Sequence, residues 1–341
     1  MERTTQLIGQ STSFLDAVER ASRAAPLNRP VLVIGERGTG KELIAERLHR
    51  LSGRWDGPLV VMNCAALPET LIEAELFGHE AGAFTGAGKG RTGRFEEADG
   101  GTLFLDELAT LSRAAQDRLL RAVEYGELTR IGSNKAIEVD VRIVAATNEH
   151  LPRLVEEGRF RADLLDRLSF EVVTLPPLRH RRSDIPLLAD HFGRRMAVEL
   201  DWPRWPGFSD DAAALLLGHE WYGNVRELRN VAERAVYRWE DPERAVDGIE
   251  FDPFLSPWTP AAAVAADSPA EGEEKAAAAA AEASHDPSDC SDFRLAVAEY
   301  EKAILTAALE KCRWNQRATA AALQLTYDQL RHAMKRHELQ G

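Results

Sequence analysis

A glycine-rich segment after a short apolar run could bind phosphate. Residues 35–41 read Gly-Glu-Arg-Gly-Thr-Gly-Lys, between the strand-like run Val31–Ile34 and the helical spacing of residues 43–51. Glycines let backbone N–H groups approach phosphate oxygens, the start of a helix favours negative charge, and the lysine pairs with the β- and γ-phosphates. The pattern predicts an ATP-binding phosphate loop made of Gly35, Glu36, Arg37, Gly38, Thr39, Gly40, Lys41 and Glu42.

Two adjacent carboxylates, Asp106 and Glu107, follow a second apolar run at residues 103–105. Asp106 would hold Mg²⁺ through water, and Glu107 would polarise the water that attacks the terminal phosphate. An Asp-Glu pair after a strand can also cap a helix. With a phosphate loop upstream, however, the pair favours ATP hydrolysis. Glu42 stands where the pattern usually has a Ser or Thr that binds magnesium, so that ligand must come from elsewhere.

Further polar residues could reach the terminal phosphate. Thr147 and Asn148 end a later apolar run, and Asn148 could bond the γ-phosphate or the attacking water, although asparagine is also common in plain turns. Arg161 and Arg167 flank an apolar helix and could reach the γ-phosphate of a neighbouring subunit as arginine fingers, which requires a ring. Alternatively, Asp163 and Arg167 form an ordinary surface pair four residues apart.

A small-residue loop with one large apolar side chain lies between the phosphate loop and the acidic pair. Its residues are Gly82, Ala83, Phe84, Thr85, Gly86 and Ala87. Glycine loses much backbone entropy on ordering, and an apolar side chain on a mobile loop is not reliably buried. The Gly82–Ala87 loop is therefore predicted to contact a partner and to be moved by the nucleotide state.

The elements that must position these residues divide the chain into four regions. Residues 1–171 alternate strand-like and helix-like segments, which indicates an α/β domain with a mostly parallel sheet. Residues 172–250 follow paired prolines and carry three helical patterns, which predicts a small helical lid. Residues 251–290 form an acidic linker rich in Ala and Pro that is expected to be flexible. Residues 291–341 regain helical periodicity as a third small domain.

The C-terminal region has the spacing of a helix-turn-helix. From Lys311 to the end, six Lys or Arg face two Asp or Glu, a formal charge of +4. Leu330 and Met334 are predicted to face inward, which leaves the second helix available to the major groove of DNA. A three-helix protein-binding or dimerisation module is the alternative. The candidate DNA-binding residues are Tyr327, Gln329, Arg331, His332 and Lys335.

Composition narrows the class of protein. The 341 residues allow two or three domains, and 44% hydrophobic with 28% charged residues fits a globular protein. A net charge of −13 excludes a surface that binds nucleic acid throughout. The three cysteines have no paired spacing, so a reducing cytoplasm is expected. No apolar run is long enough to cross a bilayer.

These motifs in this order resemble the AAA+ ATPases. The Gly82–Ala87 loop, with Glu-Leu-Phe-Gly-His-Glu-Ala at residues 75–81 and Gly-Arg-Phe-Glu-Glu-Ala at residues 93–98, makes the chain similar to the bacterial enhancer-binding proteins, which activate sigma-54 RNA polymerase. The similarity runs from about residue 7 to residue 254 and resumes in the C-terminal region, which resembles a Fis-like helix-turn-helix domain.

The resemblance implies roles for individual residues. Lys41 would bind phosphate, Asp106 and Glu107 would support magnesium and hydrolysis, and Asn63 would couple the catalytic glutamate to the loop. Thr147 and Asn148 match the first sensor, Arg161 and Arg167 the fingers, and Arg226 the second sensor on the lid. The Gly82–Ala87 loop would contact sigma-54 while a ring, expected to be a hexamer, holds enhancer DNA.

The ATPase pattern begins within ten residues of Met1, where most of these activators have a sensing domain. Control is therefore expected from outside the chain. This layout resembles the subgroup that controls the phage shock operon and is inhibited in trans by phage shock protein A. Trp55, in a turn-rich segment, is a candidate anchor for that inhibitor. The alternative is that Trp55 folds back on the sheet edge.

Two other functions are alternatives to a transcription activator. A different AAA+ remodeller, such as an unfoldase or helicase loader, would share the ATP site but would not explain the Gly82–Ala87 loop beside a helix-turn-helix. A DNA-binding regulator with a decayed ATPase is disfavoured because Lys41, Asp106, Glu107 and both candidate finger arginines are intact.

Overall fold

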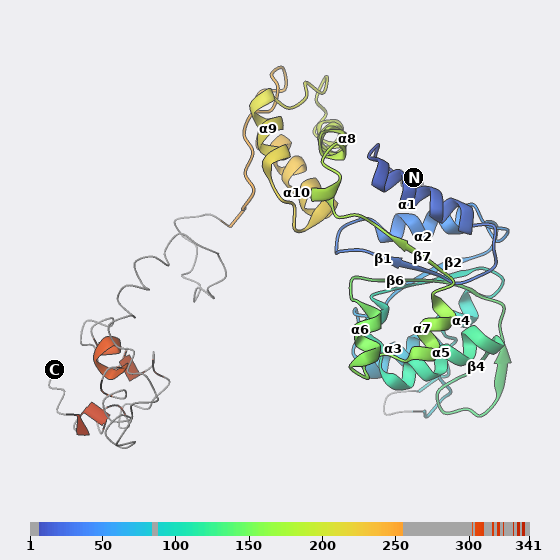
Figure 1. Cartoon of the computed structure of the whole chain (residues 1–341). Helices are drawn as coiled ribbons and strands as arrows, with labels where there is room; N and C mark the ends of the chain where they lie inside the picture. Colours follow the sequence, from blue (N-terminus) through green and yellow to red (C-terminus); the bar gives the residue numbers. More distant parts are fainter. Residues whose placement is uncertain are drawn as a thin grey trace. The chain divides into compact units, whose positions relative to one another are not determined.

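A computed structural model of the chain describes residues 7–83 and 88–254 and, beyond them, Lys302, residues 304–309 and several single positions up to His337. The chain divides into two compact units, Met1–Leu255 and Ser256–Gly341 (Figure 1). The first unit contains an α/β domain and a lid.

A five-stranded parallel sheet forms the centre of the α/β domain, in the order β2-β3-β6-β1-β7. Its strands are β1 (Val31–Ile34), β2 (Leu59–Asn63), β3 (Thr102–Asp106), β6 (Arg142–Thr147) and β7 (Glu171–Thr174). In register, Asn63 lies opposite Asp106, and Ile34 lies opposite Thr147. The candidate site residues at the ends of these strands therefore meet at one edge of the sheet, where the carboxyl ends of parallel strands meet.

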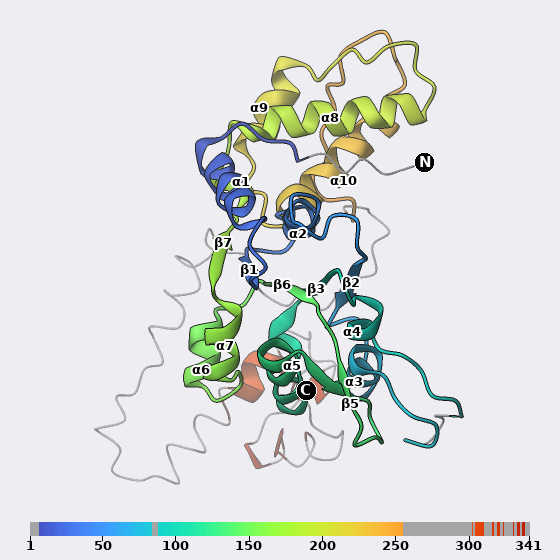
Figure 2. The ribbon, with the colours of Figure 1, turned by 90° about the vertical axis from the view of Figure 1, so that its right-hand side faces the viewer.

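Helices cover both faces of the sheet (Figures 1 and 2). On one face lie α1 (Thr12–Ala24) and α2 (Lys41–Arg50). On the other lie α3 (Glu69–Phe77), α4 (Arg94–Glu97), α5 (Arg113–Tyr125), α6 (Leu151–Glu156) and α7 (Ala162–Leu168). Burial on both faces explains why the strands are continuous apolar runs.

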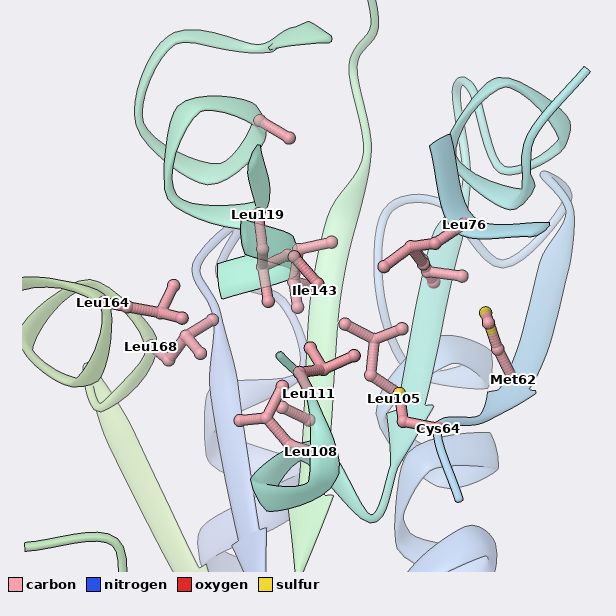
Figure 3. Close-up of a cluster of buried hydrophobic side chains, with 14 of the residues drawn as sticks. Met62, Cys64, Leu76, Leu105, Leu108, Leu111, Leu119, Ile143, Leu164 and Leu168 are labelled. Atoms are coloured by element: carbon pink, nitrogen blue, oxygen red, sulfur yellow. The ribbon is translucent and has the colours of Figure 1, made fainter. Parts of the chain in front are cut away.

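Alternation along β3 divides the core into two layers. Leu103 and Leu105 belong to the cluster beneath α3 and α5, where Leu105 lies among Met62, Cys64 and Leu111 (Figure 3). Phe104 points the other way into the cluster beneath α1 and α2. Successive side chains of a strand point to opposite faces of the sheet, so β3 contributes side chains to both layers of the core.

The lid is a group of helices that follows β7. It consists of the short 3₁₀ helix η2 (Leu178–His180) and of α8 (Asp184–Glu199), α9 (Asp210–Gly218) and α10 (Asn224–Tyr237). The fully buried Trp221 packs at its centre, and its indole N–H donates to the carbonyl of Leu216. Burial of an indole requires such an acceptor, because an unpaired N–H would cost free energy.

A small hairpin stands beside the sheet. It joins β4 (Glu127–Thr129) to β5 (Ala136–Glu138), and a 3₁₀ helix, η1 (Leu108–Thr110), follows β3. The hairpin and the segment that enters the Gly82–Ala87 loop project from the same end of the domain (Figure 2).

The structure confirms the predicted parallel α/β sheet and helical lid, including the strands near residues 31–34, 59–62 and 103–105. It adds β7, which the sequence analysis did not predict. This strand begins at Glu171, so the sheet extends past residue 171, where the α/β region was expected to end.

In the second unit, residues 304–309 are helical. Leu305, Leu309, Ala320, Leu330 and Met334 are buried together, which confirms the inward positions predicted for Leu330 and Met334. The expected linker lies almost wholly outside the described residues. No helix in the described parts of either unit is long and apolar enough to span a membrane.

Candidate nucleotide site

The phosphate loop joins β1 to α2. Lys41, the first residue of α2, is buried, and its Nζ atom donates to the carbonyl of Gly35 over 3.0 Å. Burial lowers the pKa of Lys41 from its usual value, while the carboxylates of Asp106 and Glu107 act in the opposite direction. A buried ammonium that donates to backbone carbonyls can exchange those bonds for bonds to phosphate oxygens.

The acidic pair ends β3 beside this lysine. The Oδ1 atom of Asp106 accepts a hydrogen bond from the amide of Glu107, 3.0 Å. Glu107 has a left-handed backbone with φ 55°, uncommon outside glycine, which costs free energy and is typical of functional sites. Its Oε1 atom lies 3.6 Å from Nε of Arg37 in the phosphate loop.

Three more predicted residues lie at the ends of β2 and β6. Thr147 is buried, its carbonyl accepts from the amide of Gly35, and its hydroxyl accepts from the amide of Glu149. Asn148 is exposed. The exposed Asn63 uses Oδ1 to accept from the amide of Ala65, 2.8 Å, and no hydrogen bond among the described residues joins it to Glu107.

A cleft of about 840 Å³ opens between the α/β domain and the lid. Its lining includes the apolar side chains of Leu7, Ile8, Phe14, Leu188 and Phe192 together with Gly38, Thr39, Gly40, Lys41, Glu42, Asp106 and Arg226. Apolar side chains that could contact a base and phosphate-loop residues that could bind phosphates match the two parts of a nucleotide.

The lid contacts the phosphate loop directly. Arg226, the predicted second sensor, lies in the first turn of α10 and lines the cleft. Glu36 does not line it; its carboxylate accepts from Arg179 and Asn224 of the lid. Arg179 holds the pKa of Glu36 at about 2, well below its usual range.

The candidate fingers lie away from the cleft of their own chain. Arg161 pairs with Asp117 and Asp163, and Arg167 pairs with Glu124 over 2.5 Å. The described residues that line the cleft include neither arginine. The expected alternative pair of Asp163 with Arg167 is not the pairing found, because Asp163 binds Arg161.

A buried glutamine fixes the backbone of the first finger. Gln116 is fully buried on α5; its amide N–H groups donate to the carbonyls of Leu111 and Arg159, and its Oε1 accepts from the amide of Arg161. All three bonds satisfy a buried polar side chain, so the start of α7 is held firmly.

The base of the Gly82–Ala87 loop is bonded to the hairpin. The amide of Glu80 donates to the carbonyl of Ile131, 3.0 Å, and Arg130 pairs with both Glu80 and Glu96. A side chain on Gly132 would come within 2.8 Å of Ala83, so glycine permits the two segments to meet. Phe84, Thr85, Gly86 and Ala87 lie outside the described residues.

Trp55 lies on a tightly bonded loop after α2 with 68% of its surface exposed, so it does not fold back on the sheet edge. The neighbouring Arg54 donates to Asp140 and Asn28, and Ser52 bonds the backbone on both sides. A rigid loop that exposes an aromatic ring suits a partner contact. The candidate DNA-binding residues lie outside the described residues: Tyr327, Gln329, Arg331, His332 and Lys335.

The residues present fit magnesium bound together with nucleotide. Among the described residues no group of three or more His, Cys, Asp or Glu could hold a metal alone. Mg²⁺ commonly uses one or two carboxylates together with substrate phosphates and water. Asp106, which lines the cleft, could supply such a carboxylate.

Three sequence families match consecutive parts of the chain. Residues 7–174 match the "Sigma-54 interaction domain", residues 179–252 the "AAA+ ATPase lid domain", and residues 296–337 the "Bacterial regulatory protein, Fis family". The chain is also 50% identical over 338 residues to the Psp operon transcriptional activator of Escherichia coli (strain K12), covering 99% of each protein. The chain belongs to the sigma-54-dependent transcriptional activators.

Other relatives of this activator share the central region or the fold. It is 54% identical over 230 residues to the transcriptional regulatory protein ZraR of Salmonella typhimurium, which is 67% of this chain and 52% of ZraR. NtrX from Brucella abortus in complex with ATP has a TM-score of 0.66 and 32% identity, covering 98% of this chain and 70% of NtrX. The activator is therefore an AAA+ nucleotide-binding ATPase with a Fis-type helix-turn-helix.

Sequence reasoning missed Gln116, Arg179, Asn224 and also Arg181, whose Nη2 donates to the carbonyl of Thr39 over 3.1 Å. Each acts through contacts with residues distant in the chain, so no local pattern identifies it. The only available signal was position: Asn224 lies two residues before Arg226, and Arg179 and Arg181 follow the paired prolines.

Proposed function

We propose that this chain forms a ring, expected to be a hexamer, that hydrolyses Mg²⁺-ATP to ADP and phosphate and uses the energy to remodel sigma-54 RNA polymerase. The Gly82–Ala87 loop would press against sigma-54 and convert a closed promoter complex into an open one. The observation that carries this proposal is the loop base, which is bonded to a hairpin of the same domain that holds the ATP site.

In the site itself, Lys41 would bind the β- and γ-phosphates and Asp106 would hold the magnesium ion. Magnesium would neutralise the charge that develops on the phosphates. Glu107 would orient and polarise the attacking water, with Thr147 and Asn148 at the adjacent strand end. Arg226 would sense the phosphates from the lid, since it lines the same cleft.

Hydrolysis would depend on a neighbouring subunit. Arg161 and Arg167 are outside the cleft of their own chain, which supports a role in trans. A guanidinium that stabilises the charge on a transferring phosphoryl group accelerates phosphoryl transfer strongly. The ion pairs with Asp117, Asp163 and Glu124 would hold both arginines until an interface forms.

A conformational change at the nucleotide site would be transmitted to the Gly82–Ala87 loop through β2 and α3. Asn63 ends β2 beside Asp106, and α3 leads directly to the loop base. We propose that Asn63 exchanges its turn bond to Ala65 for a contact with Glu107 during the cycle. If the γ-phosphate favours one conformation of the loop over another, its binding and release shift the populations of the two conformations.

Two further partners are proposed. The C-terminal domain would bind enhancer DNA through its second helix, with Tyr327, Gln329, Arg331, His332 and Lys335 as candidate contacts. Trp55 would bind phage shock protein A as a negative regulator, and the target would be the phage shock operon. The 50% identity to the Psp operon transcriptional activator along nearly the whole chain supports this assignment.

Promoter opening by the purified chain tests the proposal. With ATP, it should open a sigma-54 promoter bound by the matching holoenzyme and leave a sigma-70 promoter unaffected. Opening of neither promoter, at protein concentrations where ATP is hydrolysed, would contradict the proposed function.

A further inference from the structure

Glu36 lies in the phosphate loop but directs its carboxylate to the lid. Nη1 and Nη2 of Arg179 donate to its two oxygens over 2.8 and 2.5 Å, and Nδ2 of Asn224 donates to Oε2 over 3.0 Å. A two-pronged arginine–carboxylate contact fixes orientation as well as distance. The side chain that follows the first glycine of the phosphate loop therefore binds the lid.

Asn224 joins three segments at the start of α10. It is fully buried and has a left-handed backbone with φ 54°. Its Nδ2 also donates to the carbonyl of Arg37, 3.1 Å, and its Oδ1 accepts from the amide of Leu178, 2.7 Å. Such a conformation persists only where surrounding contacts hold it, and here those contacts reach both the phosphate loop and the first lid residues.

Donors of the lid occupy three successive carbonyls of the phosphate loop. Asn224 donates to the carbonyl of Arg37. The amide of Val225 donates to the carbonyl of Gly38, 3.0 Å, and Nη2 of Arg181 donates to the carbonyl of Thr39, 3.1 Å. A side chain on Gly38 would come within 2.4 Å of the carbonyl of Gly223. The loop and the start of α10 are therefore in close backbone contact, and a shift in one must move the other.

We propose that Glu36, Arg179 and Asn224 are positioning residues that bond the lid to the phosphate loop and so place Arg226 opposite the nucleotide phosphates. Arg226 lies two residues after Asn224, in the first turn of α10. The inference rests on the proposed hydrolysis of ATP at this site. Beyond that function, these three residues would position the lid without having to contact the nucleotide themselves.

Variants of the ion pair test the kinetic consequence. Arg179→Gln should lower kcat for ATP about tenfold, with the Kd for ADP within about twofold of wild type. Arg179→Lys should lower kcat less than Arg179→Gln does. The double variant Glu36→Gln, Arg179→Gln should lower kcat no more than the worse of the two single variants. Arg182→Gln is the matched control, because this neighbouring lid arginine pairs with Glu220 on the surface.

Hydrogen exchange gives a readout that does not require hydrolysis. In Asn224→Ala and Arg179→Gln, the amide of Val225 should exchange faster than in wild type or Arg182→Gln, while amides of β3 stay protected. The proposal is overturned if exchange at Val225 is unchanged, or if Arg179→Gln keeps kcat within about twofold of Arg182→Gln. Parallel loss of ATP binding, ADP binding and Tm would assign a purely structural role and also overturn it. A wild-type chain without ATPase activity would contradict the proposed hydrolysis, and the exchange result would still decide the positioning role.

Discussion

Nε of Arg37 lies 3.6 Å from Oε1 of Glu107, so an ion pair links the phosphate loop to the end of β3. The residue proposed to polarise water is therefore held by the loop that would bind the phosphates. The Arg37 side chain is 71% exposed, so a bound nucleotide would attract its guanidinium and release the carboxylate of Glu107. In this arrangement, phosphate binding and the proposed activation of the water would be coupled.

Glu107→Gln should separate binding from hydrolysis. The amide keeps the shape of the side chain but cannot act as a base, so kcat should fall at least about 100-fold. The Kd for ATP should remain within about threefold of wild type, because Lys41 and the loop amides are unchanged. Steady-state ATPase assays and equilibrium titration measure the two quantities. Hydrolysis at half the wild-type rate or more would show that Glu107 is not the base.

Mixing two inactive variants should restore activity. Lys41→Ala lacks the phosphate contact and Arg161→Ala lacks a finger, but a mixed ring contains interfaces with an intact site and an intact finger. Because the arginine's own ion pairs are at the surface, Arg161→Ala should change Tm little. Arg153→Ala is the control, since that arginine pairs with Glu157 on the surface of α6. If mixtures show only the sum of the two residual rates, the finger does not act in trans.

Much of the site could be predicted from sequence because its motifs are local. The phosphate loop, the acidic pair and Thr147 follow apolar strands, and parallel pairing brings the ends of those strands together. Arg179 and Asn224 could not be predicted, because they lie 143 and 188 residues from Glu36 and only the tertiary fold brings them near. β7 was not predicted because it is short and has only two apolar residues, Val172 and Val173, between the polar Glu171 and Thr174.

Trp55→Ala should abolish inhibition by phage shock protein A while ATPase activity in the absence of the inhibitor remains unchanged. The exposed ring makes few contacts within the chain, and removal of an aromatic anchor commonly abolishes an interface. Tyr125→Ala is a matched control, because Tyr125 is also largely exposed, at the end of α5. ATPase rates with increasing inhibitor measure the effect. Full inhibition of the Trp55 variant would assign the inhibitor to another surface.

The Glu36–Arg179 pair should contribute to stability in a pH-dependent way. The folded-state pKa of Glu36 is about 2, below its usual 4.5, first because of the hydrogen bonds from Arg179. A carboxylate with a depressed pKa contributes stability above its unfolded pKa and loses it as the pH falls through the folded pKa. The difference in free energy of unfolding between wild type and Glu36→Gln should therefore be constant above pH 4.5 and shrink as the pH falls toward 2.

Urea unfolding at several pH values measures that difference. The same comparison in an Arg179→Gln background is the control, because the pair is absent there and the pH dependence should largely disappear. A difference that grows as the pH falls would have the wrong sign and would contradict the assigned cause.

The central claim is that ATP hydrolysis drives the Gly82–Ala87 loop against sigma-54. Open-complex formation on a sigma-54 promoter, measured with wild type and Thr85→Ala at equal rates of ATP hydrolysis, tests it most directly. The account predicts that wild type opens the promoter and that Thr85→Ala hydrolyses ATP but leaves it closed. Equal opening by the two proteins would contradict the account.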